Sequence, residues 1–190
     1  MTATNWMAFK SGTDIRGTAM GGVRRKDFLS SRAVSAITAA YVAWLCDNLK
    51  LTTENMTVSV GHDSRLSAGR LKKIVIGTLR GLGVSVLDCG MSSTPAMFLT
   101  TVSLKCSGAI QITASHHPAD RNGLKFFTRV GGLNAADITD ILTRAQNAGK
   151  PVPGNPKDAE KCDYMNNYAS SLREMICKGV NAVDYMRPLR

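Results

Sequence analysis

Apolar residues along this chain change their spacing several times, and each change predicts a switch between helix and strand. Spacings of three and four predict helices at residues 30–49, 71–83, 94–104, 134–145 and 164–176. Short alternating or continuous apolar runs predict strands at residues 56–60, 84–89, 108–112 and 124–128. The succession of strand, helix, strand, helix and strand in the middle of the chain predicts an α/β fold.

The predicted fold class is a three-layer α/β/α sandwich with a mixed, mostly parallel sheet. Loops at the carboxyl ends of such strands lie along one edge of the sheet and carry function. At 190 residues the chain can bury one core but is short for two. We therefore predict one α/β domain over residues 1–150. Residues 151–190 are predicted to form a proline-rich connector and a C-terminal helix packed on the same domain.

Composition and charge narrow the class of protein. The chain is 44% hydrophobic and 20% charged, which is typical of a globular protein. The formal net charge is +10, but only Arg24, Arg25 and Lys26 form a cluster. This excess is typical of a solvated basic surface, and it also fits a field for an anionic ligand or a face for an acidic partner. Because no basic stripe with interleaved aromatic residues is present, we expect no nucleic-acid partner.

The cysteines and the N-terminal residues give no sign of export. The five cysteines are never closer than fifteen residues, so their spacing indicates neither a disulfide framework nor a CxxC site. The sequence has no run of eighteen apolar residues, and residues 1–6 lack the basic start of a signal peptide. We expect a cytoplasmic protein that does not associate with a membrane.

The segment 112–127 holds most of the candidate chemistry. It follows the predicted strand 108–112 and includes Ser115, His116, His117, Asn122 and Lys125. A hydroxyl, two imidazoles and an ammonium thus lie within eleven residues, from Ser115 to Lys125, at the end of a strand. Such a loop can present a phosphorylatable serine among hydrogen-bond donors.

Two further segments contain charged residues between glycines or after a strand. Residues 12–17 predict a turn with an Asp14 to Arg16 ion pair, and an anion site is the alternative. In the loop after strand 56–60, His62, Asp63 and Arg65 precede a helix whose start could bind an anion. These three side chains either brace the loop or contact a ligand, and the sequence leaves both open.

Together these segments resemble the N-terminal domain of a known enzyme family. Gly-Thr-Asp-Ile-Arg-Gly from residue 12, Gly-His-Asp-Ser-Arg from residue 61, Thr-Ala-Ser-His-His-Pro from residue 113 and Asn-Gly-Leu-Lys from residue 122 occur in the order found in the α-D-phosphohexomutases, the phosphomannomutase and phosphoglucomutase family. The resemblance implies an intramolecular phosphotransferase. It would interconvert hexose 1-phosphate and hexose 6-phosphate of the mannose or glucose type through a phosphoserine and a bisphosphorylated sugar.

The resemblance also implies roles for individual residues. Ser115 matches the phosphoserine, whose phosphate ester is stable in water yet transferable once cations neutralise its charge. Lys125 matches a residue for proton transfer or charge stabilisation, Arg16 a part of the same cationic pocket, and His116 a neighbour of the transferring group. The expected phosphate-binding residues are Thr13, Arg16, His117, Asn122 and Lys125.

Two departures from the family pattern qualify these expectations. His117 stands where the family usually has asparagine. The aspartate-rich Asp-Gly-Asp-Gly-Asp-Arg segment that binds Mg²⁺ in the second domain is absent. We therefore expect Ser115 to contact Mg²⁺ only through its phosphate, with the other ligands in a missing domain. The expected partners are a phosphosugar substrate and domains II to IV of the same polypeptide, with glucose or mannose 1,6-bisphosphate as activator.

Other classes of function remain as alternatives. An isolated first domain is expected to fold and to have little or no mutase activity. A non-catalytic anion-binding or interaction module that keeps the fold is the main alternative, and His117 is the residue that favours it. Nucleic-acid binding would depend on the net charge alone.

Overall fold

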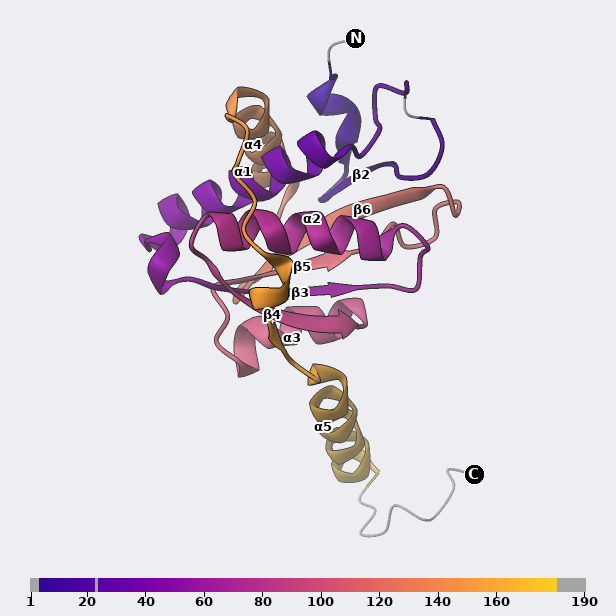
Figure 1. Ribbon diagram of the computed structural model, residues 1–190. Coiled ribbons are helices and arrows are strands. Elements are labelled where there is room, and N and C mark those ends of the chain that lie inside the picture. The colour runs from indigo at the N-terminus through magenta and orange to yellow at the C-terminus, as the bar shows by residue number, and fades with distance from the viewer. Residues whose placement is uncertain (1–3, 23, 181–190) are drawn as a thin grey trace.

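A mixed sheet forms the centre of the computed structural model, which describes residues 4–22 and 24–180 (Figure 1). Its strands are β1 (Lys10–Ser11), β2 (Asp14–Thr18), β3 (Thr57–His62), β4 (Ser85–Met91), β5 (Gly108–Ile112), β6 (Arg121–Thr128), β7 (Gly131–Gly132) and β8 (Glu160–Lys161). The order is β1-β2-β6-β5-β3-β4-β8, with β7 paired to β6. β3, β4, β5 and β8 pair in parallel with one another, whereas β6 is antiparallel to both β5 and β2.

Helices cover both faces of this sheet, which confirms the predicted α/β/α class (Figure 1). The helices are α1 (Ser31–Leu49), α2 (Ala68–Gly81), α3 (Thr94–Ser103), α4 (Ala135–Asn147) and α5 (Tyr164–Gly179), with short 3-10 turns η1 (Trp6–Phe9), η2 (Thr53–Asn55) and η3 (Pro156–Asp158). α1 and α2 pack on one face, α4 packs beside α1, and α3 covers part of the other face. Among the described residues, no helix is long and apolar enough to cross a membrane.

The alternation of side chains in β6 divides the core in two. Leu124 and Phe126 lie in the large cluster under α1, α2 and α4, where the Phe126 ring is 4.5 Å from that of Tyr41. Phe127 lies in a smaller cluster with α3. Since successive strand residues point to opposite faces, Lys125 lies on the α3 side, with its ammonium 5.8 Å from the centre of the Phe127 ring.

The predicted helix starts are partly confirmed. Ser30 and Asn134 cap α1 and α4 through their side chains, as expected from residues that accept hydrogen bonds from free amides. Ser93 caps α3 through its side chain, just before the start predicted at residue 94. Ser67, the residue before α2, makes no side-chain cap there.

The prediction of a turn over residues 12–17 is only half right. Gly12 and Thr13 form the turn, but Asp14 begins β2, which pairs with β6 along its whole length from Ile15. The charged sequence of β2 hides its strand character, because its one large apolar residue, Ile15, gives no visible alternation. Long-range pairing with β6 supplies the backbone hydrogen bonds that decide the conformation.

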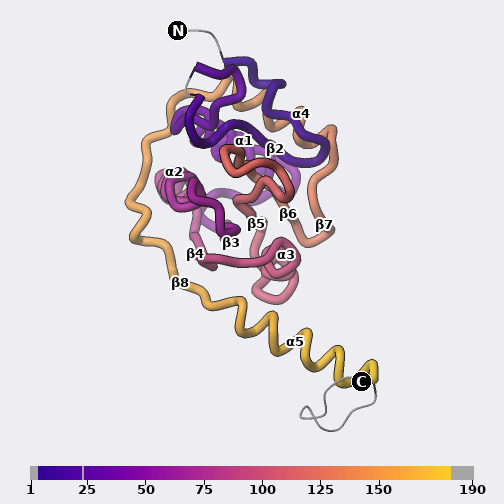
Figure 2. The backbone as a smooth tube through the Cα atoms, turned by 90° about the vertical axis from the view of Figure 1, so that its right-hand side faces the viewer, coloured from indigo at the N-terminus to yellow at the C-terminus, as the bar shows by residue number. Residues whose placement is uncertain are grey.

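The connector after α4 runs along the outside of α2 and joins the far edge of the sheet as β8 (Figure 2). The amide of Gly154 donates to the carbonyl of Gly77 over 2.8 Å, so the two backbones nearly touch. α5 then leaves the body of the molecule, and its buried residue is Tyr164, whose hydroxyl lies 2.6 Å from Ser103 Oγ of α3. The end of the predicted C-terminal segment, residues 181–190, lies outside the described residues.

Candidate active site

Ser115 lies three residues after β5, in the loop of residues 113–120 that we call the Ser115 loop. Its side chain is exposed and its φ is +54°, in the left-handed region. A left-handed conformation costs a residue with a side chain on the order of 1 kcal/mol. The amide of Ser115 donates to Thr113 Oγ1 over 2.9 Å. The turn therefore presents the hydroxyl to solvent, where a reacting group can reach it.

The two histidines that follow lie side by side at the surface. His116 Nδ1 is 3.4 Å from Ser115 Oγ, and the two imidazole rings are 5.1 Å apart. Partial desolvation lowers the pKa of His117, and the positive charges of Arg16 and Arg121 lower it further. The field around the loop is therefore positive, which disfavours another cation and favours an anion.

Asp14 joins two of the candidate cations. Its Oδ2 accepts from Arg16 Nη2 and its Oδ1 accepts from Lys125 Nζ, each over 2.7 Å. The antiparallel register pairs Ile15 with Leu124, so Asp14 lies opposite Lys125 and both point to the α3 side. The Asp14 to Arg16 ion pair was predicted from the sequence and is confirmed. The bond to Lys125, 111 positions away, had no local signal.

Gly123 brings Arg16 close to the Ser115 loop. It pairs with Arg16 across the β2 and β6 ladder, and its carbonyl accepts from the amide of Thr113. A methyl group on Gly123 would overlap the carbonyls of Ile15 and Thr113 and would lie 2.9 Å from Arg16 Cγ. Glycine is required for this close approach. Arg16 Nε is buried and has no hydrogen-bond partner among the described residues.

Two further predicted binding residues, Asn122 and Thr13, make no hydrogen bond to the cluster of Asp14, Arg16 and Lys125 in the described part of the chain. Asn122 is fully buried, donates to Ser67 Oγ over 2.8 Å and accepts from the amide of Gly123 over 2.8 Å. Its amide group therefore braces the interior below the loop and is not brought to the open surface. Thr13 is exposed in the turn between β1 and β2, next to Asp14.

Arg65 contacts the Ser115 loop from the neighbouring strand. It follows β3, and its guanidinium donates to four backbone carbonyls, those of Ser115, His117, Pro118 and Arg121. Asp63 Oδ2 lies 3.3 Å from Arg65 Nε, and the Asp63 amide donates to the carbonyl of Ile112. Of the two readings that the sequence left open for Arg65, the structure shows the bracing contacts.

The described residues do not by themselves fit a resident Mg²⁺. Residues 4–22 and 24–180 contain no group of three or more His, Cys, Asp or Glu side chains that could hold a metal ion. Asp14, the carboxylate of the cluster, is already paired with two cations. A hard divalent cation requires about six oxygen ligands, and the Ser115 oxygen supplies one.

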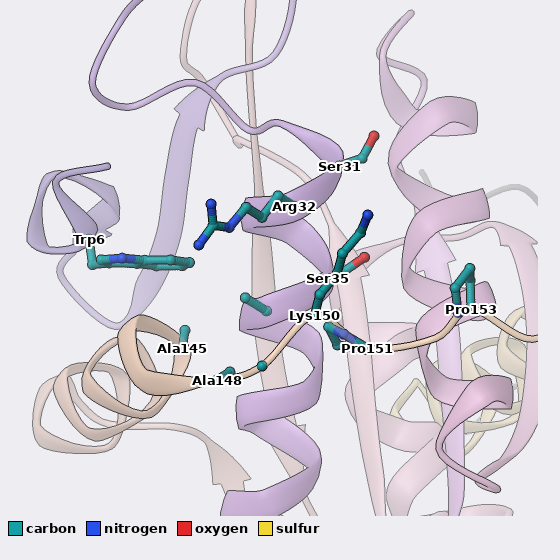
Figure 3. Close-up of a pocket in the computed structure, with 11 residues that line it drawn as sticks. Trp6, Ser31, Arg32, Ser35, Ala145, Ala148, Lys150, Pro151 and Pro153 are labelled. Carbon is teal, nitrogen blue, oxygen red and sulfur yellow. The ribbon is translucent and has the colours of Figure 1, made fainter. Parts of the chain in front are cut away.

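Ser115 and His116 are exposed, whereas the side chains of Asp14 and Arg16 are largely buried. A cavity of about 350 Å³ lies elsewhere, between η1, α1, α4 and the connector, with Trp6, Arg32 and Lys150 on its walls (Figure 3). None of the predicted site residues lines it.

The sequence of this chain matches a known protein family. Residues 11–151 match the family described as phosphoglucomutase/phosphomannomutase, alpha/beta/alpha domain I. The structure defines an α/β/α domain that has an exposed serine after β5 and a buried carboxylate paired with two cations on β2 and β6. The chain belongs to the phosphoglucomutase/phosphomannomutase family, as the first of that family's domains.

Two relatives carry names that agree with this family. A phosphoglucosamine mutase of Campylobacter jejuni is 31% identical over 166 residues, which cover 83% of this chain and 36% of the relative. A protein of Xanthomonas campestris named phosphohexose mutases is 29% identical over 132 residues, covering 66% of this chain and 30% of the relative. The chain thus spans about a third of the length of these relatives.

Solved structures show the same fold. A phosphoglucomutase/phosphomannomutase family protein from Burkholderia thailandensis superposes with a TM-score of 0.71 at 24% identity, covering 92% of this chain and 36% of that chain. A putative phosphomannomutase from Thermus thermophilus gives 0.69 at 23% identity, with 92% and 37% covered. The fold here is therefore that of about one third of each of those chains.

Proposed function

We propose that this chain is the phosphoserine-bearing domain of a phosphohexomutase. Ser115 would carry the phosphoryl group and exchange it with hexose 1-phosphate and hexose 6-phosphate. The observation that supports this proposal best is the exposed Ser115 hydroxyl just after β5, in a loop whose His117 lies in the positive field of Arg16.

The proposed chemistry is a pair of phosphoryl transfers that balance each other. In the first, the bond from phosphorus to Ser115 Oγ breaks and a bond to a sugar hydroxyl oxygen forms, giving a hexose bisphosphate. The sugar hydroxyl loses its proton in this step, and the released Ser115 oxygen takes one up. In the second, the other phosphate of the bisphosphate returns to Ser115, and the isomeric monophosphate leaves.

Arg16 and Lys125 would stabilise the charge of the migrating group. Phosphoryl transfer depends mainly on positioning and on cations around the equatorial oxygens. Arg16 contributes a buried N–H at Nε with no described partner, a donor that a phosphate oxygen could satisfy. Lys125 would contribute positive charge or a proton, and His116 would contact the oxygen of Ser115.

The remaining partners are part of the same proposal. We propose that domains II to IV of the polypeptide complete the site, supply the oxygen ligands for Mg²⁺ and recognise the sugar. Mg²⁺ would neutralise charge on the phosphate of Ser115 when bound. Glucose or mannose 1,6-bisphosphate would be the activator and a cytoplasmic location is expected. Mannose and glucose phosphates are the proposed substrates, and the names of several relatives make glucosamine phosphate the first alternative.

A labelling experiment tests the role of Ser115. The complete polypeptide, incubated with glucose 1,6-bisphosphate and Mg²⁺, should gain one phosphate by intact mass, located at Ser115 by peptide mapping. Ser115→Ala should gain none, and Ser103→Ala, which removes an exposed hydroxyl on α3, serves as the control that should still be labelled. Label that persists in Ser115→Ala would show that another residue carries the phosphate.

The alternative is a non-catalytic anion-binding module with the same fold. His117 in place of the usual asparagine is the sequence feature that favours it. In that case the complete polypeptide would bind a sugar phosphate without gaining mass. The 190-residue chain alone should fold and show no Mg²⁺-dependent interconversion of hexose 1- and 6-phosphates, and full activity of this chain alone would refute the need for further domains.

A further inference from the structure

The guanidinium of Arg65 contacts the Ser115 loop at several points. Arg65 Nη2 donates to the carbonyls of Ser115 over 2.8 Å and His117 over 2.7 Å. Its Nη1 donates to the carbonyls of Pro118 over 2.7 Å and Arg121 over 3.0 Å. The four carbonyls span the loop from the reactive residue to the start of β6, so one side chain fixes both ends of the turn.

The hydrogen-bonding capacity of Arg65 is fully used within the protein. A guanidinium has five N–H donors, four of which point to these carbonyls. The fifth, at Nε, faces Asp63 Oδ2 at 3.3 Å, and only 13% of the Arg65 side chain is exposed. All of its hydrogen bonds among the described residues go to the loop and the start of β6, and its Nε is paired with a carboxylate. Arg65 therefore acts on the loop and does not bind the phosphate directly.

The backbone conformation of Ser115 explains why the loop needs these contacts. Among the described residues, the left-handed residues other than glycine are Lys50, Lys105 and Ser115. Lys50 and Lys105 lie at or just after the ends of helices, where this conformation is ordinary. Ser115 instead follows a strand, and a strained conformation there persists only if the surroundings fix it. The contacts that fix it are Thr113 Oγ1 on its amide and Arg65 on its carbonyl.

We infer that Arg65 is a positioning residue that holds Ser115 in its left-handed conformation and so keeps the Ser115 hydroxyl exposed to solvent. The conformational part of this inference stands on the geometry alone. Its consequence for phosphoryl transfer rests on the proposed function. Lysine cannot replace Arg65, because an ammonium has three donors around one point and cannot serve four carbonyls in a plane.

Hydrogen exchange tests the conformational part on the 190-residue chain. Arg65→Lys should speed exchange at the amides of Ser115, His117 and Arg121 by about tenfold, the effect of losing one net hydrogen bond. Arg80→Lys is the control, because Arg80 also donates to a backbone carbonyl, that of Val84, just before β4 and away from the loop. Loop exchange that is unchanged by Arg65→Lys, or raised equally by Arg80→Lys, would overturn the inference.

The backbone strain provides a second test that does not require Arg65→Lys to fold. Glycine adopts a positive φ without cost, so Ser115→Gly should shift the folding equilibrium toward the native state by about fivefold relative to Ser115→Ala. If Ser115→Gly is no more stable than Ser115→Ala in urea unfolding, Ser115 is not under the strain that Arg65 is inferred to hold.

Phosphorylation kinetics of the complete polypeptide test the consequence for the reaction. Arg65→Lys should lower the initial rate of phosphate uptake at Ser115 from glucose 1,6-bisphosphate by about tenfold. The half-saturating concentration should stay within about twofold, because Arg65 acts on the loop and does not bind the phosphate directly. Arg80→Lys should change neither. An altered half-saturating concentration with an unchanged rate would contradict a positioning role. If the unmodified polypeptide takes up no phosphate, the proposed function fails, and hydrogen exchange still decides the role of Arg65.

Discussion

Lys125 Nζ lies 2.7 Å from Asp14 Oδ1, across two antiparallel strands and 111 positions of sequence. The second oxygen of the same carboxylate binds Arg16. Asp14 is 6% exposed, so two cations that would otherwise repel each other are held together by one buried anion. Both cations therefore lie on the same side of the β2 and β6 pair.

Asp14→Asn should therefore destabilise the protein and disperse the cations. Removing the buried carboxylate leaves Arg16 and Lys125 without their shared partner, and we expect a loss of about 2 kcal/mol in the free energy of unfolding, below the range for fully buried pairs. Urea unfolding measures it. The control is Asp140→Asn, which breaks a more exposed pair with Arg144 and should cost no more than about 0.5 kcal/mol. Equal effects of the two variants would contradict the structural role of Asp14.

Tyr41 and Gly108 should be energetically coupled. The buried Tyr41 hydroxyl donates to the carbonyl of Phe127 over 2.9 Å, and a methyl group on Gly108 would overlap that hydroxyl. Tyr41→Phe should cost about 1–2 kcal/mol because the carbonyl loses its donor. Gly108→Ala should cost less in the Tyr41→Phe background than in the original protein. A double-mutant cycle in urea measures the coupling, and additive effects would show that the hydroxyl is not the obstacle.

Stability should decrease in acid because of Asp88. Burial opposes ionisation of Asp88, but hydrogen bonds from Lys161, Lys72 and the amide of Gly90 outweigh it and lower the pKa below the usual 3.8. A lowered pKa in the folded state adds stability above the unfolded pKa and loses it as pH falls through the folded value. Asp88→Asn should have a lower free energy of unfolding than the original protein at pH 6, and this difference should shrink as the pH falls toward about 2. Unfolding in urea measures the difference at each pH. A difference that is constant over this range would rule out the ion pairs as its source.

The capping box of α4 predicts a local loss of stability. Asn134 accepts from the amides of Ala136 and Asp137, and Asp137 returns a bond to the amide of Asn134. Asn134→Ala should cost about 1 kcal/mol in the free energy of unfolding. Asn147→Ala, at the last residue of α4, is the control and should cost less. Thermal unfolding checks both, and equal shifts of the midpoint would argue against the cap.

The sequence by itself determined the elements whose signals are local. The apolar periods located the four major strands and five helices, because burial of one face repeats every 2 or 3.6 residues. The spacing from Ser115 to Lys125 and the neighbouring motifs indicated the family, and the Asp14 to Arg16 pair followed from residues two positions apart.

Only the tertiary structure decided which distant residues meet. β2 has no clear strand pattern in the sequence. Its pairing with β6 depends on the register of two segments that are far apart in the chain. The contact between Asp14 and Lys125 depends on the same register. The same holds for Arg65, which could have bound a ligand or braced a loop, and for Asn122, which was expected to bind phosphate and which the fold buries. A period in the sequence specifies which face of an element is buried, whereas contacts between elements depend on the sheet order that all of them establish together.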